Sequence, residues 1–105
     1  MRAKSIASAV LTAAAVLGSS TTFAADVQHG ATIARRWCSS CHVVASNQRQ
    51  ITGEAPPFAT IAHMPAFDEH RLAFFLLDPH PKMPDMGLSR TDAADLAAYI
   101  ASLGK

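Results

Sequence analysis

The run Cys38-Ser39-Ser40-Cys41-His42 contains both cysteines of this 105-residue chain. The Cys-x-x-Cys-His spacing is typical of the attachment site of a c-type haem. Residues three and four apart share one face at the start of a helix, so Cys38 and Cys41 can each form a thioether with a haem vinyl group while His42 lies beneath the iron. We therefore expect one covalently attached haem c, with His42 as an axial iron ligand.

The N-terminal segment has the pattern of a signal peptide. Arg2 and Lys4 precede an uncharged, mostly apolar stretch over residues 6–18, and small or hydroxylated residues follow it. The apolar stretch is shorter than the roughly 20 residues that a membrane-spanning helix needs, so an uncleaved anchor is the weaker alternative. We therefore expect export to the periplasm and no membrane insertion after processing.

Cleavage is expected after Ala24, because Thr22 and Ala24 then occupy positions −3 and −1. Cleavage after Ala25 stays open as an alternative. Residues 1–24 are accordingly assigned to the signal peptide and residues 25–105 to a single domain. At this size, about 80 residues, a protein core alone is only marginally stabilising. A tethered porphyrin would add apolar core, so we expect cofactor attachment and folding to be coupled.

The charge balance speaks against a nucleic-acid partner. The chain has nine Lys and Arg residues and eight Asp and Glu residues, and two of the basic residues, Arg2 and Lys4, lie in the expected signal peptide. The remaining domain is close to neutral and has no basic tract. It therefore lacks the electrostatic footprint that binds phosphate backbones.

Periodicity predicts a first helix that runs from Asp26 to the cysteine motif. Small and apolar residues recur there at spacings of three and four, and Asp26 can cap the first turn. The residues expected on one face of this helix are Val27, Gly30, Ala31, Ala34, Trp37 and Cys38. Glycine is costly inside a helix, so we expect Gly30 to permit the close approach of a second helix.

Two further helices are predicted downstream. One begins near Asp68 and ends at Asp78-Pro79, because the residue before a proline disfavours the helical conformation. The other begins with Ser89 and Asp92 as a capping box and is stopped by Gly104. The expected apolar faces are Leu72, Phe75 and Leu76 in the former, and Leu96, Tyr99, Ile100 and Leu103 in the latter.

The segment between the cysteine motif and the second helix is expected to be a loop on the His42 side of the haem. Residues 43–64 show no sustained periodicity and contain Pro56 and Pro57. The residues that follow these prolines allow one short helix near residues 58–63. No strand alternation competes with the helices. We therefore expect an all-α fold of three main helices and loops around one covalently attached haem.

The second iron ligand is expected in the loop before the last helix. Three prolines in and beside this loop restrict it and lower the entropy cost of holding a side chain at the iron. A thioether ligand favours the ferrous state and raises the reduction potential. Met83 is the preferred ligand, Met86 is the alternative, and His80 is a weaker candidate. We expect Met64 to fill a core gap instead.

Two interpretations of the cysteines without haem are weaker. A redox dithiol would use Cys38 and Cys41 for disulfide exchange, but such enzymes place the pair beside a βαβ unit. A zinc site would need further ligands, for which His63 and His70 are the only weak candidates. Like His29, these two histidines are expected on the surface.

Taken in order, these segments resemble the small monohaem class I cytochromes c of bacteria over essentially all of residues 25–105. The resemblance rests on residues 38–42, on Ala55-Pro56-Pro57-Phe58, on residues 83–89 and on residues 95–103. It implies Met83 as the distal ligand and packing of Gly30 near Tyr99. It also implies a hydrogen bond from His42 Nδ1 to a proline carbonyl, Pro56 first, which would orient the ring and strengthen it as a ligand.

The expected function is that of a one-electron carrier, not an enzyme, which docks briefly with redox partner proteins at the haem edge. A haem subunit held in a dehydrogenase or oxidase complex is one alternative. A gas-binding or peroxidase-like haem protein, whose distal methionine leaves the iron, is another. Trp37, next to Cys38, is expected either beside the exposed haem edge or packed against the porphyrin.

Overall fold

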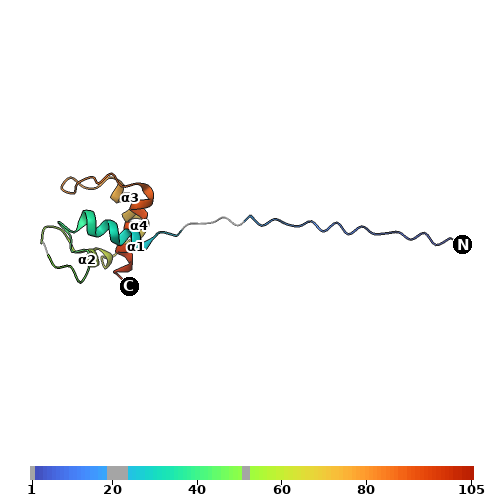
Figure 1. The fold of residues 1–105 in the computed structure, drawn as a ribbon, viewed down its shortest axis with the longest axis horizontal. Coiled ribbons are helices and arrows are strands. Elements are labelled where there is room, and N and C mark those ends of the chain that lie inside the picture. The colour runs from blue at the N-terminus through green and yellow to red at the C-terminus, as the bar shows by residue number, and fades with distance from the viewer. Residues whose placement is uncertain (1, 19–23, 51–52) are drawn as a thin grey trace.

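The computed structural model describes residues 2–18, 24–50 and 53–105 (Figure 1). Its helical elements are α1 (Val27–Ile33), η1 (Ala34–Cys38), α2 (Phe58–Ala62), α3 (Glu69–Leu77) and α4 (Arg90–Ser102). No strand occurs in the described ranges. The expected all-α fold is therefore confirmed, with α2 as the short helix anticipated near residues 58–63.

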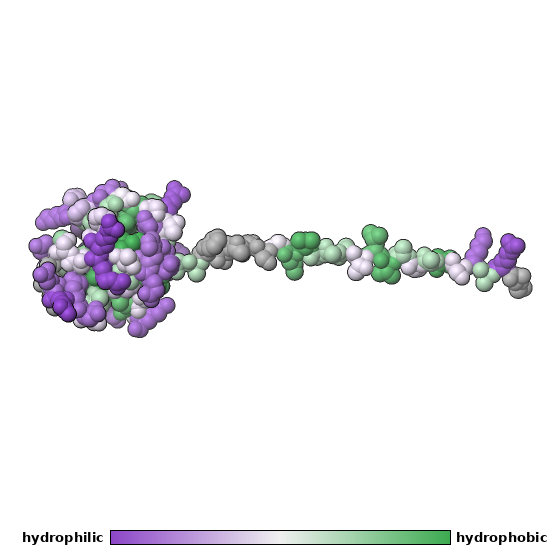
Figure 2. All heavy atoms as spheres, viewed as in Figure 1, coloured by the Kyte–Doolittle hydropathy of each residue, from purple (hydrophilic) through white to green (hydrophobic). Residues whose placement is uncertain are grey.

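Residues 2–18 form an extended segment that lies outside the helical domain (Figures 1 and 2). Its apolar side chains are open to solvent, and Ile6, Leu11 and Val16 are 89–92% exposed. Thr22, part of the expected cleavage site, lies outside the described residues. Within the described residues, none of the helices is long and apolar enough to cross a membrane.

Side-chain caps account for where the helices begin. The Asp26 carboxylate accepts an N–H of the first turn of α1 at 3.0 Å, and Asp68 does the same for α3 at 2.8 Å. At the start of α4, the Asp92 N–H donates to Ser89 Oγ and the Ser89 N–H donates to the Asp92 carboxylate. These bonds satisfy donors that the first helical turn leaves without intrahelical acceptors. The predicted helix starts are thus confirmed.

Helix α4 forms the centre of the core, because α1 and α3 both pack against it. Leu96 and Ile100 of α4 are each 1% exposed, and burial extends without interruption from Asp95 to Ile100. The buried part of this helix is therefore wider than the predicted apolar face, because α1 and α3 both cover it. A helix covered on several sides buries residues beyond a single stripe.

Gly30 lies where α1 crosses α4. A Cβ atom at this position would lie 2.0 Å from the Asp95 carbonyl oxygen and 2.9 Å from Tyr99 Cβ. Real carbon atoms do not approach a carbonyl oxygen so closely, so a residue without a side chain is required. The predicted packing of Gly30 near Tyr99 is confirmed.

The helix that leads to the cysteine motif departs from the expected regular repeat. Residues of η1 adopt π-helical geometry, in which a turn contains more residues than in an α-helix. Four of the six residues on the predicted face are nevertheless buried, namely Gly30, Ala31, Ala34 and Cys38. The other two are partly open to solvent: Val27, in the first turn of α1, is 37% exposed and Trp37 is 46% exposed.

Two other predicted positions differ from the structure. Met64 is 47% exposed in the turn after α2, so it does not fill a core gap. Phe75 is 39% exposed on α3 and contacts the His80 ring at a centroid distance of 5.8 Å.

Gly104 directly follows Leu103, the C-cap of α4, so this helix ends where the sequence predicts. A Cβ at Gly104 would lie 3.0 Å from the Ala62 carbonyl oxygen. The missing side chain therefore also permits α2 to approach the end of α4.

Candidate functional site

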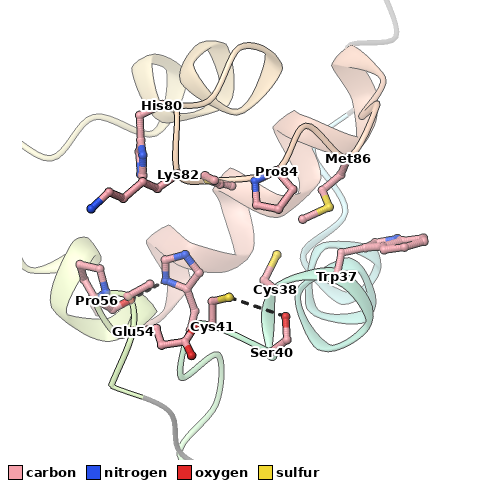
Figure 3. A pocket seen from close by; sticks show the side chains of 13 residues that line it. Trp37, Cys38, Ser40, Cys41, Glu54, Pro56, His80, Lys82, Pro84 and Met86 are labelled. Carbon is pink, nitrogen blue, oxygen red and sulfur yellow. Dashed lines mark hydrogen bonds between the residues drawn. The ribbon is translucent and has the colours of Figure 1, made fainter.

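A cavity of about 350 Å³ brings the cysteine motif and the loop before α4 together (Figure 3). Cys38, Cys41 and His42 line it from one segment, and Met83 and Met86 line it from the other. The sulfur atoms of Cys38 and Cys41 point into the space below the loop, and Met86 faces Cys38 across it (Figure 3). The fold thus gathers the cysteines, the histidine and both candidate methionines around one space.

A tight turn holds the cysteine motif together. Helix η1 ends at Cys38, and the N–H groups of Cys41 and His42 both donate to the Cys38 carbonyl oxygen, at 3.2 and 2.9 Å. The Ser40 hydroxyl approaches Cys41 Sγ at 3.8 Å. The turn brings the motif to one side of the helix end, as its spacing predicts.

The Cys38 thiol has the wrong acidity for disulfide exchange. Cys38 is 5% exposed, and this burial raises the pKa of its thiol from 9.0 to about 11. Cysteines that exchange disulfides instead have lowered pKa values, because the thiolate is the reactive form. Burial of Cys38 therefore speaks against this residue as the attacking thiol of a disulfide exchange.

Two contacts orient the His42 ring. Its Nδ1 atom lies 2.6 Å from the Pro56 carbonyl oxygen. Because a carbonyl only accepts hydrogen bonds, Nδ1 carries the proton and Nε2 is the ring atom available to a metal. The ring also packs against the buried Phe58 ring, at a centroid distance of 5.0 Å and an angle of 46°. The structure thus contains the hydrogen bond that the resemblance implies.

The loop after the motif reaches back to it through backbone hydrogen bonds. The Ala55 N–H donates to the Cys41 carbonyl at 3.2 Å, and the Phe58 N–H donates to the Val43 carbonyl at 2.9 Å. These bonds bring Pro56 to His42 although 14 residues separate the two in the sequence. The loop therefore covers the His42 side of the cavity, as expected.

Both methionines of the second loop reach the cavity, in different surroundings. Met83 is half-buried, packs against the hydrophobic core and donates its N–H to the His80 carbonyl at 2.9 Å. Met86, also half-buried, lies in the turn that Asp85 and Gly87 close. In this turn the Gly87 N–H donates to Asp85 Oδ1 at 2.8 Å, and Gly87 has a φ of +63° that favours glycine.

Of the remaining histidines, His80 lines this cavity, whereas His29, His63 and His70 are not among its lining residues. His63 and His70 are exposed, as expected, and His63 Nδ1 bonds to the Ala59 carbonyl at 2.6 Å. His29 is half-exposed, but it has a partner that was not expected: its Nδ1 atom lies 2.7 Å from Asp95 Oδ2. In the part of the chain that the structure describes, no group of three or more His, Cys, Asp or Glu residues can hold a metal ion.

Two polar residues of this region have no local sequence signal. Asp95 is 4% exposed and lies 66 residues from His29 in the sequence. Gln48 makes several hydrogen bonds with the backbone beside His42. No local pattern indicates either set of contacts, and only the folded chain shows them.

The residues that line the cavity fit a covalently attached haem. Two thiols at Cys-x-x-Cys spacing supply the attachment atoms, and an oriented imidazole supplies Nε2. Thioether sulfur, the second ligand type of low-spin electron-transfer haems, lies in the same cavity. No rearrangement of the chain order or topology is needed to bring these groups to one porphyrin.

Comparison with known proteins leads to the same class. Residues 25–100 match the family described as cytochrome c oxidase, cbb3-type, subunit III. Cytochrome c-552 of Bradyrhizobium diazoefficiens is 56% identical over 93 residues, which make up 89% of this chain and 89% of that protein. No solved structure matches the chain. The chain therefore belongs to the small monohaem c-type cytochromes, which carry covalently attached haem c and transfer electrons between redox partners without acting as enzymes.

Proposed function

We propose that this cytochrome is a diffusible one-electron carrier of the periplasm, with His42 and Met83 as the axial ligands of its haem iron. When bound, haem c accepts and releases one electron as its iron alternates between the ferric and ferrous states. The observation that carries the proposal is the cavity shared by Cys38, Cys41, His42 and Met83.

On one side of this cavity, the chain supplies attachment and a strong nitrogen ligand. Cys38 and Cys41 would provide the thioether sulfurs, and His42 would provide Nε2. The Pro56 carbonyl, 2.6 Å from His42 Nδ1, fixes the tautomer and raises the electron-donor strength of the ring. Pro56 would thus act on the iron through His42.

On the other side, Met83 is better supported than Met86. Its contact with the core and the hydrogen bond of its N–H to His80 restrict its position in the folded protein. Pro81 and Pro84 further limit the loop in the unfolded chain. A loop restricted in this way suits a weak ligand, and a filled second axial position disfavours gas or peroxide chemistry.

Partner docking is expected near Trp37. This side chain lines the cavity and is 46% exposed, and the Arg36 guanidinium lies 4.9 Å from its ring centroid. A small interface around such a rim suits brief redox encounters, which must end after electron transfer. The donor and acceptor would be proteins that present their own redox centre to this rim.

Export supports the periplasmic part of the proposal. Arg2, Lys4 and the apolar stretch that follows have the composition of a signal peptide, and residues 2–18 contribute nothing to the helical core. We propose cleavage after Ala24. Intact mass of the protein purified from the periplasm tests this: the mature chain should begin at Ala25 and carry the mass of one haem.

The family description favours a second candidate, permanent membership of an oxidase complex. The two candidates differ in solution behaviour. Size-exclusion chromatography of native extracts should yield the carrier as a free monomer with the visible spectrum of a c-type cytochrome. Elution of all of it with a larger oxidase would favour the complex.

The ligand set is tested by the near-infrared spectrum of the ferric protein. A methionine-ligated ferric haem shows a weak sulfur-to-iron band there, and we expect this band for the untreated protein at neutral pH. A spectrum without it would exclude both Met83 and Met86, and with them the proposed carrier mechanism.

A further inference from the structure

We propose that Gln48 is a positioning residue for His42: its side-chain amide fixes the backbone that carries the proximal ligand. This inference rests on the proposed function, which makes His42 an iron ligand. Gln48 lies in the loop after the cysteine motif and is partly buried.

The amide of Gln48 uses both of its ends. Its Oε1 atom accepts the Val44 N–H at 2.7 Å. Its Nε2 atom lies 3.1 Å from the His42 carbonyl, 3.2 Å from the Ser39 carbonyl and 2.8 Å from the Gln50 carbonyl. One side chain is therefore within hydrogen-bonding distance of backbone groups of four residues. Elsewhere in the fold, regular secondary structure satisfies such backbone groups.

Two of the backbone groups that contact Gln48 belong to the cysteine motif itself. Ser39 lies between the two cysteines and His42 directly follows the second, so Gln48 holds carbonyls on both sides of Cys41. Pro56 and Phe58 orient the His42 ring, but neither touches its backbone in the contacts described for them. Gln48 restrains the backbone, and these two residues restrain the ring.

Val44 connects this arrangement to the core. It is 1% exposed, its N–H donates to Gln48, and its carbonyl accepts the Tyr99 hydroxyl of α4 at 2.5 Å. A buried N–H that loses its acceptor is costly, so Val44 also requires Gln48 to stay in place. The backbone of the haem motif is thereby tied, through Gln48 and Val44, to the most buried helix.

The test compares local with global opening in the intact, haem-loaded ferrous protein. Gln48→Ala should accelerate hydrogen exchange of the His42 Nδ1 proton at least tenfold more than exchange of the Leu96 and Ile100 amides. The α4 amides report global unfolding. The Val44 amide loses its direct acceptor, so its faster exchange only confirms that this contact is gone. A purely structural role would accelerate the His42 proton and the two α4 amides by the same factor, and that result would overturn the proposal.

A second variant separates the donor from the acceptor. Gln48→Glu keeps the length of the side chain and an acceptor for the Val44 N–H, but it loses the donor to the His42 and Ser39 carbonyls. We expect Val44 to keep most of its protection and His42 Nδ1 to lose at least tenfold. If Gln48→Ala does not yield holoprotein, Gln48→Glu alone tests the proposal. The proposal is overturned if the Val44 amide and the His42 Nδ1 proton are as well protected from exchange in Gln48→Glu as in the unmodified protein.

The equilibrium constant for reduction of the haem protein provides an independent measure of how His42 is positioned. Because His42 Nε2 would donate to the iron, altered positioning should change the equilibrium constant for reduction by a mediator at least threefold in Gln48→Ala, which adds no charge. Gln28→Ala, an exposed position on α1, is the matched control and should leave this constant unchanged. An unchanged value in Gln48→Ala would contradict positioning. Failure of the proposed ligand set would instead show in the near-infrared spectrum of the unmodified protein.

Discussion

His29 on α1 and Asp95 on α4 form an ion pair in which Nδ1 and Oδ2 are 2.7 Å apart. The other carboxylate oxygen, Asp95 Oδ1, accepts the Asp26 N–H at 2.8 Å. Asp95 is 4% exposed, so these two hydrogen bonds compensate for burying its charge. The pair joins the start of the first helix to the middle of the last helix.

This ion pair predicts that stability depends on pH. The hydrogen bond to Asp95 raises the pKa of His29 above its ordinary 6.5, and the charges of Asp95, Asp92 and Asp26 act in the same direction. The stabilising contribution should be complete below the unfolded pKa and should disappear as pH rises through the higher folded pKa. Guanidinium unfolding at several values between about pH 5 and pH 8 measures it.

His29→Gln should remove that part of the pH dependence, because glutamine does not titrate. Asp95→Asn provides the paired control: adding His29→Gln to this variant should have no further effect on the slope. An unchanged slope in the single His29→Gln variant would show that other groups cause it.

Gly30→Ala should destabilise the protein through the crossing of α1 and α4. The new Cβ would lie 2.0 Å from the Asp95 carbonyl oxygen, so the helices must separate. We expect a loss of about 2–3 kcal/mol in the free energy of unfolding, despite the better helix propensity of alanine. Gly53→Ala is the control, since a Cβ there would meet no atom within 4 Å. Equal stability of both variants would contradict the close crossing.

Met83→Ala should abolish the near-infrared sulfur band and lower the reduction potential while the haem stays covalently attached. The reason is that a neutral thioether favours ferrous iron. Met86→Ala should keep the band, and so should Met64→Ala, whose side chain is 47% exposed. Loss of the band only in Met86→Ala would transfer the ligand role to Met86.

Replacing Cys38 and Cys41 together by alanine should leave a largely unfolded chain without covalent haem. The domain is small, and its cofactor would supply part of the apolar core. Circular dichroism and haem staining after denaturing electrophoresis measure the two effects. Ser40→Ala, which keeps both cysteines, should retain stain and helicity. A native-like helical spectrum of the double variant without haem would refute the coupling.

Local signals predicted much of this fold. Asp26, Asp68 and the Ser89–Asp92 box begin their helices as expected, because a cap depends on residues only two or three positions away. The spacing within the cysteine motif likewise determines its turn. Gly30 was also predictable, since an exposed helix gains nothing from a glycine in its interior.

Other features depend on contacts that no local pattern contains. The His29–Asp95 pair joins residues 66 positions apart, and the four backbone partners of Gln48 converge only after the loop has folded. The π-helical geometry of η1 likewise has no signal in the regular repeat of this segment. Each of these features arises from tertiary packing, which a local pattern does not contain.

The Tyr99 hydroxyl bond to the Val44 carbonyl gives the C-terminal end of the chain a role far from it in the sequence. Every side chain assigned to haem binding precedes α4, so a polypeptide truncated before Tyr99 would keep the whole attachment apparatus and lose only its anchor. Truncation at this end should therefore loosen the haem site without removing any of its ligands.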